Sequence, residues 1–134
     1  MSSSVPLRVL VVDDDDDFRL MLRVQLNLVP GVEVVGTARD GYEALEEVDR
    51  VRPEAVAMDL LMPNLDGFEA IDQLHLDHPG VGVVAYTAVA GQYARDRVAG
   101  QGVELVLKSG DPTELVAALR RSAERSRNGG PGGS

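Results

Sequence analysis

Short apolar runs alternate along the chain with segments of helical periodicity, and this alternation restricts the fold more than any other feature. The runs occupy residues 9–12, 32–35, 55–58, 81–86 and 103–107. They are rich in β-branched residues and too short for helices, so we interpret them as strands. Uninterrupted apolar strands of this kind are typical of parallel sheets covered on both faces.

Between the runs, apolar residues recur at the spacing of a helix face. The sets are Phe18, Leu22, Leu26 and Val29, then Ala44, Leu45 and Val48, then Phe68, Ile71 and Leu74. Pro30-Gly31, Pro53 and Pro79 follow them and predict where these helices end.

Three predicted helices begin with the same local pattern, an aspartate followed three residues later by a glutamate. The pairs are Asp40 and Glu43, Asp66 and Glu69, and Asp111 and Glu114. We expect each aspartate to cap its helix, where carboxylates meet free N–H groups and the positive end of the dipole. Pro112 would then be the first helical residue of the last helix.

Five alternating strand and helix units predict a (βα)5 protein with right-handed crossovers and an open, doubly wound parallel sheet. The helix expected between residues 87 and 99 is the least secure, because Gly91 inside it would cost about 1 kcal/mol relative to alanine. We predict that it is the most labile helix. Residues 126–134 lack apolar side chains and are expected to form a flexible tail or linker.

Composition narrows the range of partners. The formal net charge is −9, which argues against a surface that binds nucleic acid or anionic membranes. Cysteine is absent, so disulfides and thiolate metal sites are excluded.

No apolar stretch approaches the ~20 residues that span a bilayer, and the N-terminus lacks the pattern of a signal peptide. We therefore expect a cytoplasmic protein.

Chemically active side chains follow four of the predicted strands. Asp13 and Asp14 follow the first strand, Asp59 the third, Thr87 the fourth and Lys108 the fifth. In open parallel sheets the ligand site lies beyond the carboxyl ends of the strands, so these side chains should converge. Three converging carboxylates repel one another unless a cation joins them. Oxygen ligands with room for a phosphate favour Mg²⁺, and a carboxylate beside it suits an aspartyl phosphate.

Four segments together resemble the receiver domain of two-component response regulators: VLVVDD, AVAMDLLMPNLDG, VVAYTA and LVLKSG. The resemblance covers about residues 7 to 121 and is greatest to receivers that precede a helix-turn-helix output domain. It implies a flavodoxin-like sheet of order 2-1-3-4-5 in residues 7–125, after an N-terminal extension of residues 1–6. The Asp-rich run has only a superficial likeness to an EF-hand loop.

The resemblance also implies a role for each site residue. Asp59 would accept a phosphoryl group from a histidine kinase or a phosphotransfer protein. Asp13, Asp14, Asp59 and the backbone carbonyl of Leu61 would serve Mg²⁺, while Thr87 and Lys108 would contact the phosphoryl group. The protein would be a switch and not an enzyme, limited to self-phosphorylation from small donors and slow self-dephosphorylation. Its output would be an attached domain, a target protein or a homodimer, reached through the fourth helix, fifth strand and fifth helix.

Two other interpretations stay open. A haloacid-dehalogenase-type phosphatase would need an acid two residues after its nucleophile, but Leu61 follows Asp59, and Asp17 replaces the usual Thr or Val after Asp13-x-Asp15. A pseudo-receiver would fold without ever taking phosphate.

The chain departs from the family at two places. The position three residues before the lysine is usually aromatic in the family and is Leu105 here. Because a leucine cannot reproduce a rotating aromatic ring, the coupling from Thr87 to the output face would depend more on displacement of the helix containing Gly91. Leu61 and Val89 flank the expected site and cannot orient a water, which predicts self-hydrolysis over hours.

Overall fold

A computed structural model describes residues 5–88, 90–109 and 111–128. Five strands alternate with five helices in the predicted order. The strands are β1 (Leu7–Val12), β2 (Val32–Ala38), β3 (Ala55–Met58), β4 (Gly82–Thr87) and β5 (Glu104–Leu107). The helices are α1 (Asp16–Asn27), α2 (Gly41–Val51), α3 (Gly67–Asp77), α4 (Gln92–Gly100) and α5 (Thr113–Arg127).

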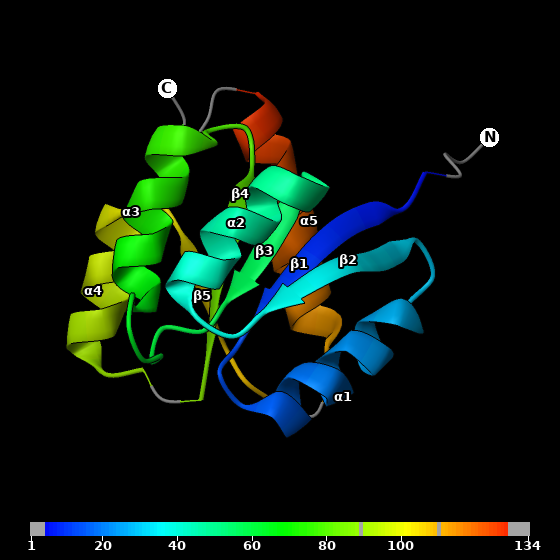
Figure 1. Cartoon of the computed structure of the whole chain (residues 1–134), viewed down its shortest axis with the longest axis horizontal. Helices are drawn as coiled ribbons and strands as arrows, with labels where there is room; N and C mark the ends of the chain where they lie inside the picture. The colour runs from blue at the N-terminus through cyan, green and yellow to red at the C-terminus, as the bar shows by residue number, and fades with distance from the viewer. Residues whose placement is uncertain (1–4, 89, 110, 129–134) are drawn as a thin grey trace.

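The five strands form one parallel sheet in the order β2-β1-β3-β4-β5 (Figure 1). This is the predicted 2-1-3-4-5 order of a flavodoxin-like fold. The three central strands, β1, β3 and β4, are buried along almost their whole length. Their continuous apolar runs are explained by this position, since neither face of these strands meets solvent.

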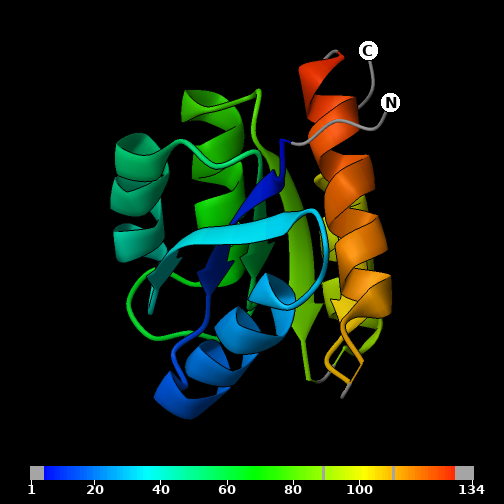
Figure 2. The same ribbon diagram turned by 90° about the vertical axis from the view of Figure 1, so that its right-hand side faces the viewer.

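Helices cover both faces of the sheet (Figure 2). Leu22 and Leu26 of α1 and Leu115 and Leu119 of α5 belong to the core on one face. The core on the other face takes its helical side chains from α2, α3 and α4, among them Ala44, Val48, Ile71, Leu74 and Val98. The three helices for which an apolar spacing was predicted, α1, α2 and α3, therefore turn that stripe toward the core.

Two of the three predicted caps are confirmed. The carboxylates of Asp40 and Asp66 accept hydrogen bonds from the backbone N–H of Glu43 and Glu69, at 2.8 and 2.9 Å. The third is wrong by one residue: α5 begins at Thr113, with Pro112 in the capping position. Asp111 instead accepts from both the backbone and the hydroxyl of Thr113, which is the geometry of a turn before the helix.

The predicted position of Gly91 inside its helix is also wrong. Gly91 occupies the N-cap of α4, so it does not interrupt the helical hydrogen bonds. It gives the helix no side-chain cap, however, and Val98 is the single buried residue of α4.

The lability of α4 therefore stays a prediction with a different cause. With one buried side chain and no capping carboxylate, α4 is expected to open locally more often than α1, α2, α3 or α5. Native-state hydrogen exchange measures this directly. Amide protection factors in residues 95–100 should be lower by roughly tenfold or more than those in α3. Equal protection in the two helices would contradict the prediction.

The ends of the domain differ slightly from the expected boundaries. The last helix continues to Arg127, two residues into the segment predicted to be a tail. The expectation for residues 129–134, and for residues 1–4 of the N-terminal extension, lies outside the described residues. None of the helices in the described ranges combines the length and hydrophobicity needed to span a bilayer.

Candidate functional site at the carboxyl ends of the strands

The sheet register brings the predicted side chains to one edge. Val12 pairs with Met58 across β1 and β3, so Asp13 and Asp59 follow paired residues. The backbone N–H of Asp59 continues the ladder by donating to the carbonyl of Val12, at 3.0 Å. On the other side, Lys108 N–H donates to the carbonyl of the last β4 residue, Thr87, at 2.8 Å. The residues that follow β1 and β3 therefore lie side by side, as do the end of β4 and the residue that follows β5.

Three carboxylates meet at this edge. One oxygen from each of Asp13, Asp14 and Asp59 lies within 4.8 Å of the others. Asp13 and Asp59 are buried, whereas Asp14 is exposed. The cluster is the one group of acidic, histidine or cysteine side chains among the described residues that could hold a metal ion. Its all-oxygen donor set and its open side suit a hard divalent cation that keeps part of its water shell.

The ammonium group of Lys108 lies among these carboxylates but favours one of them. Its Nζ is 2.5 Å from Oδ2 of Asp13 and 3.7 Å from Oδ2 of Asp59. One positive charge beside three carboxylates leaves the site with excess negative charge, which a divalent cation would offset.

The carboxyl group of Asp59 is perturbed mainly by its burial and, to a smaller extent, by this excess of negative charge. Burial, with smaller contributions from Asp13 and Asp14, raises its pKa to about 6, although Lys108 and a hydrogen bond from the backbone N–H of Leu61 act in the opposite direction. The charged form of Asp59 is therefore held in an unfavourable environment in the metal-free protein. Groups in that condition are common at functional sites.

An aromatic pair supports Lys108, and sequence reasoning missed it. The Nζ atom lies 4.1 Å from the centre of the Phe18 ring, a cation–π contact. Phe18 in turn packs against Tyr86, with ring centres 6.1 Å apart. Phe18 belongs to the helix face of α1, so its spacing indicated a core residue, and no local signal revealed that its ring reaches a lysine 90 residues away in the sequence.

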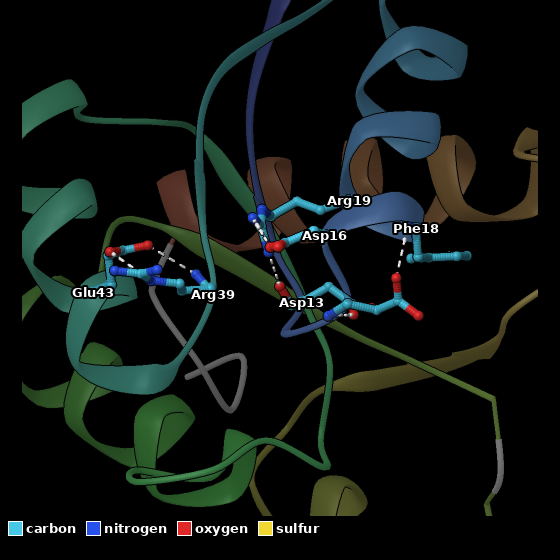
Figure 3. A network of polar contacts seen from close by, with 7 residues as sticks. Asp13, Asp16, Phe18, Arg19, Arg39 and Glu43 are labelled. Atoms are coloured by element: carbon cyan, nitrogen blue, oxygen red, sulfur yellow. Dashed lines mark hydrogen bonds and ion pairs between the residues drawn. The ribbon is translucent and has the colours of Figure 1, made fainter.

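The loop from β1 to α1 is held in place by its own acidic run (Figure 3). Asp15 caps α1 by accepting from the backbone N–H of Phe18 at 3.0 Å, and its own N–H donates to Oδ1 of Asp13. Arg19 donates to the backbone carbonyl of Asp13 at 2.7 Å and pairs with Asp16. Asp15 and Asp16 thus shape the loop, while Asp13 and Asp14 line the site.

The loop after β3 passes very close to its own beginning. A Cβ atom at Gly67 would lie 2.2 Å from the carbonyl oxygen of Asp59, so only glycine fits there. Asn64 adopts a positive φ of 66° in the same loop. The side chain of Leu61 points outward and is 67% exposed. Val89, the other residue expected to flank the site, lies outside the described residues.

The comparisons with known proteins agree with this geometry. Residues 9–120 match the family model described as the response regulator receiver domain. The chain belongs to the response-regulator receiver family. The match includes all four strand ends that carry the site, and none of the comparisons favours a phosphatase of the haloacid dehalogenase type.

Relatives and solved structures of receivers resemble this domain along most of its length. The response regulator protein VraR of Staphylococcus saprophyticus is 31% identical over 88% of this chain. A protein-glutamate methylesterase/protein-glutamine glutaminase of Myxococcus xanthus is 42% identical over 88% of it. The receiver structure of the putative response regulator NarL from Mycobacterium tuberculosis superposes with a TM-score of 0.82 at 30% identity, covering 90% of this chain and 98% of that one.

The receiver described here spans only part of the curated relatives. It covers 57% of the staphylococcal protein and 37% of the methylesterase. The activities named for those relatives therefore belong to them, and the likeness of the present chain to the receiver family concerns residues 9–120.

Proposed function

We propose that Asp59 of this receiver accepts a phosphoryl group from a sensor histidine kinase or a phosphotransfer protein. The observation that carries the proposal is the buried Asp59 carboxylate, which lies beside Asp13, Asp14 and Lys108 at the ends of three strands. A buried carboxylate with a raised pKa reduces the stability of the fold. We therefore interpret the buried Asp59 carboxylate as a group that is retained for a reaction and not for stability.

Mg²⁺ is the proposed cofactor of this reaction. The cation would be held by Asp13, Asp14 and Asp59, with the backbone carbonyl of Leu61 as a further ligand. When bound, it would supply positive charge to the incoming phosphoryl oxygens and to the crowded carboxylates. The three carboxylates supply the oxygen donors and the excess negative charge that this requires.

The proposed transfer uses the remaining side chains for positioning. An oxygen of the Asp59 carboxylate forms a bond to phosphorus as the bond to the donor's histidine nitrogen breaks, and that nitrogen keeps the electron pair. Lys108 would move from its contact with Asp13 to the new phosphoryl oxygens, a shift that its 3.7 Å distance from Asp59 makes short. The hydroxyl of Thr87, at the end of β4, would donate to the same group.

The proposed output face is formed by α4, β5 and α5, from about residue 88 to residue 121, and contacts an output domain, a target protein or a second copy. Leu105 is half-buried there and packs with the core under α4. Without an aromatic ring at this position, displacement of the weakly anchored α4 would carry the signal. Arg121 pairs with Glu104, so it adds less net positive charge to this face than the sequence suggests, whereas Arg97 lies over the ring of Phe68 and keeps its charge.

Incubation with acetyl phosphate and Mg²⁺, followed by intact mass measurement, tests this function. We expect the wild type to gain one phosphoryl group and Asp59→Asn to gain none. Sustained turnover of phosphate esters would support the phosphatase alternative, and a wild type that never gains mass would support the pseudo-receiver.

Slow loss of the phosphoryl group is a further expectation. The exposed apolar side chain of Leu61 cannot orient a water for attack on the phosphoryl group. Purified phospho-protein with Mg²⁺ should therefore lose its label over hours, as an order of magnitude. Leu61→Asn or Leu61→Glu should shorten that lifetime. A wild-type half-life of seconds would contradict the expectation.

A further inference from the structure

A groove separate from the phosphorylation site runs between α2 and α3. Its volume is about 590 Å³, and it is lined by Tyr42, Leu45, Leu65, Glu69, Asp72, Gln73 and Asp77. Leu45 and Leu65 are half-buried and pack against the core beneath, so they form an apolar floor. Tyr42 stands at the rim with 60% of its surface exposed.

The wall formed by α3 is acidic. This helix carries Glu69, Asp72 and Asp77 and contains no lysine or arginine. Asp72 and Asp77 accept hydrogen bonds from the side-chain amides of Gln101 and Gln73, both neutral groups. Within the described residues, none of the three acidic side chains forms an ion pair. Arg97 of α4 acts electrostatically on Asp72, so the negative charge that the domain leaves without a nearby cation is mainly that of Glu69 and Asp77.

The groove is formed in advance of any binding. The backbone N–H of Gly41 donates to the carbonyl of Leu65 at 3.1 Å, and the Asn64 amide donates to Asp40 at 3.1 Å. A Cβ atom at Gly41 would lie 2.5 Å from the Leu65 carbonyl, so the loop and the start of α2 are in direct contact. These contacts fix Leu65 in the floor, and a preformed surface loses little entropy on binding.

We propose that this groove is a docking surface for a positively charged amphipathic helix of a partner protein. An apolar floor beside an acidic wall matches a helix with leucine-like anchors on one face and lysine or arginine on the adjoining face. From Glu69 to Asp77, α3 extends about 12 Å at ~1.5 Å per residue, which accommodates roughly two turns of such a helix.

A second copy of this chain is a poor occupant. Its own cationic helix is α5, and three of the four arginines there are already paired with carboxylates of the same domain. Arg121 and Arg125 pair with Glu104, Arg127 pairs with Glu54, and Arg120 donates to the carbonyl of Pro30. Nucleic acid is excluded because its phosphates would meet the acidic wall.

The groove adjoins the proposed output face only at α4, where the side-chain amide of Gln101, at the end of that helix, donates to Asp72. Its lining residues belong to α2, α3 and the loop before α3, and α2 and α3 cover one face of the sheet together with α4, while α1 and α5 cover the other face (Figures 1 and 2). A partner bound there would leave Asp59 and the α5 surface accessible. The test below uses the unphosphorylated protein, in which α4 keeps its contact with Asp72, so its result is separate from that of the phosphorylation experiment.

Titration of the unphosphorylated protein with a model helix tests the proposal. The probe is a ~14-residue peptide of leucine and lysine with helical amphipathic spacing, followed by amide chemical shifts at about 0.15 M salt. A leucine–glutamate peptide of the same pattern is the control ligand. We expect the lysine peptide to perturb the residues lining the groove and the glutamate peptide to leave them unchanged.

Charge-reversal variants distinguish binding in the groove from nonspecific attraction of a cationic peptide to an acidic protein. Glu69→Lys with Asp77→Lys should weaken binding by roughly tenfold or more, while Glu33→Lys with Glu124→Lys, an equal change of charge on exposed positions elsewhere, should weaken it by less than about threefold. Tyr42→Ser, which leaves the charge unaltered, should also weaken binding. Equal losses in the two double variants would overturn the proposal, and so would shifts centred on the exposed Leu20 and Val24 of α1 and on Leu28, which follows that helix.

Discussion

Asp59→Asn is expected to stabilise the metal-free receiver by about 2 kcal/mol at pH 7.5, as measured by urea unfolding with a chelator present. The raised pKa of Asp59, about 6, is the physical reason. Ionisation of this carboxyl group is easier in the unfolded chain than in the fold, so at neutral pH it favours unfolding. Asparagine removes the charge, keeps nearly the same shape and can still accept the hydrogen bond from Leu61.

The stabilisation expected for Asp59→Asn should depend on pH. Because the folded pKa lies above the ordinary value of 3.8, the penalty is absent below about pH 4, grows between pH 4 and 6, and is complete above that. The stability difference between Asp59→Asn and the wild type should follow the same curve. Mg²⁺ should stabilise the wild type more than the variant, because the variant loses a proposed ligand.

Asp14→Asn is the matched control, since it makes the same chemical change in the exposed member of the cluster. Asp14→Asn should change the free energy of unfolding of the metal-free protein by less than about 0.5 kcal/mol. If Asp59→Asn destabilised the domain at pH 7.5, or if both variants behaved alike, the description of Asp59 as an unfavourably buried carboxylate would be wrong.

Lys108→Met should destabilise the receiver, in contrast to Asp59→Asn. We expect its free energy of unfolding to fall by about 2–3 kcal/mol at neutral pH in the absence of metal. The ammonium group lies 2.5 Å from Asp13, whose side chain is almost fully buried. Removing the cation leaves that carboxylate beside two others without compensation. Methionine preserves an apolar stem against the ring of Phe18, so the loss reports mainly on charge.

Two comparisons isolate this effect. Arg121→Met breaks an exposed pair with Glu104 and should cost less than about 1 kcal/mol. Adding Asp13→Asn to Lys108→Met should restore much of the lost stability, because the uncompensated carboxylate is then gone. A double variant no more stable than Lys108→Met would show that the loss comes from packing.

The sequence predicted the sheet well because a buried parallel strand has an unmistakable pattern. Runs such as residues 55–58 and 81–86 match β3 and β4 within a residue, and the burial of both faces explains why. The four strand ends followed from this, and with them the meeting of Asp13, Asp14, Asp59 and Lys108. The order of the strands came from the family resemblance, since periodicity alone does not determine it.

Contacts between side chains from distant segments of the sequence could not be predicted. The contact of Lys108 with Phe18 joins two distant segments, and the preference of Lys108 for Asp13 over Asp59 is a matter of about an ångström. The ends of helices were also uncertain by one or more residues, as the positions of Gly91 and Pro112 demonstrate. Capping by glycine, or by a turn before the helix, leaves a weaker sequence signal than an aspartate cap.

The most direct test of the account is to locate the phosphoryl group after reaction with acetyl phosphate and Mg²⁺. Borohydride reduces an acyl phosphate to an alcohol, so an aspartyl phosphate is converted to homoserine, which peptide mass spectrometry can place. We expect homoserine at position 59 and at no other aspartate, with the signal lost when Mg²⁺ is chelated. Homoserine at position 13 or 14, or unchanged labelling in Asp59→Asn, would contradict it.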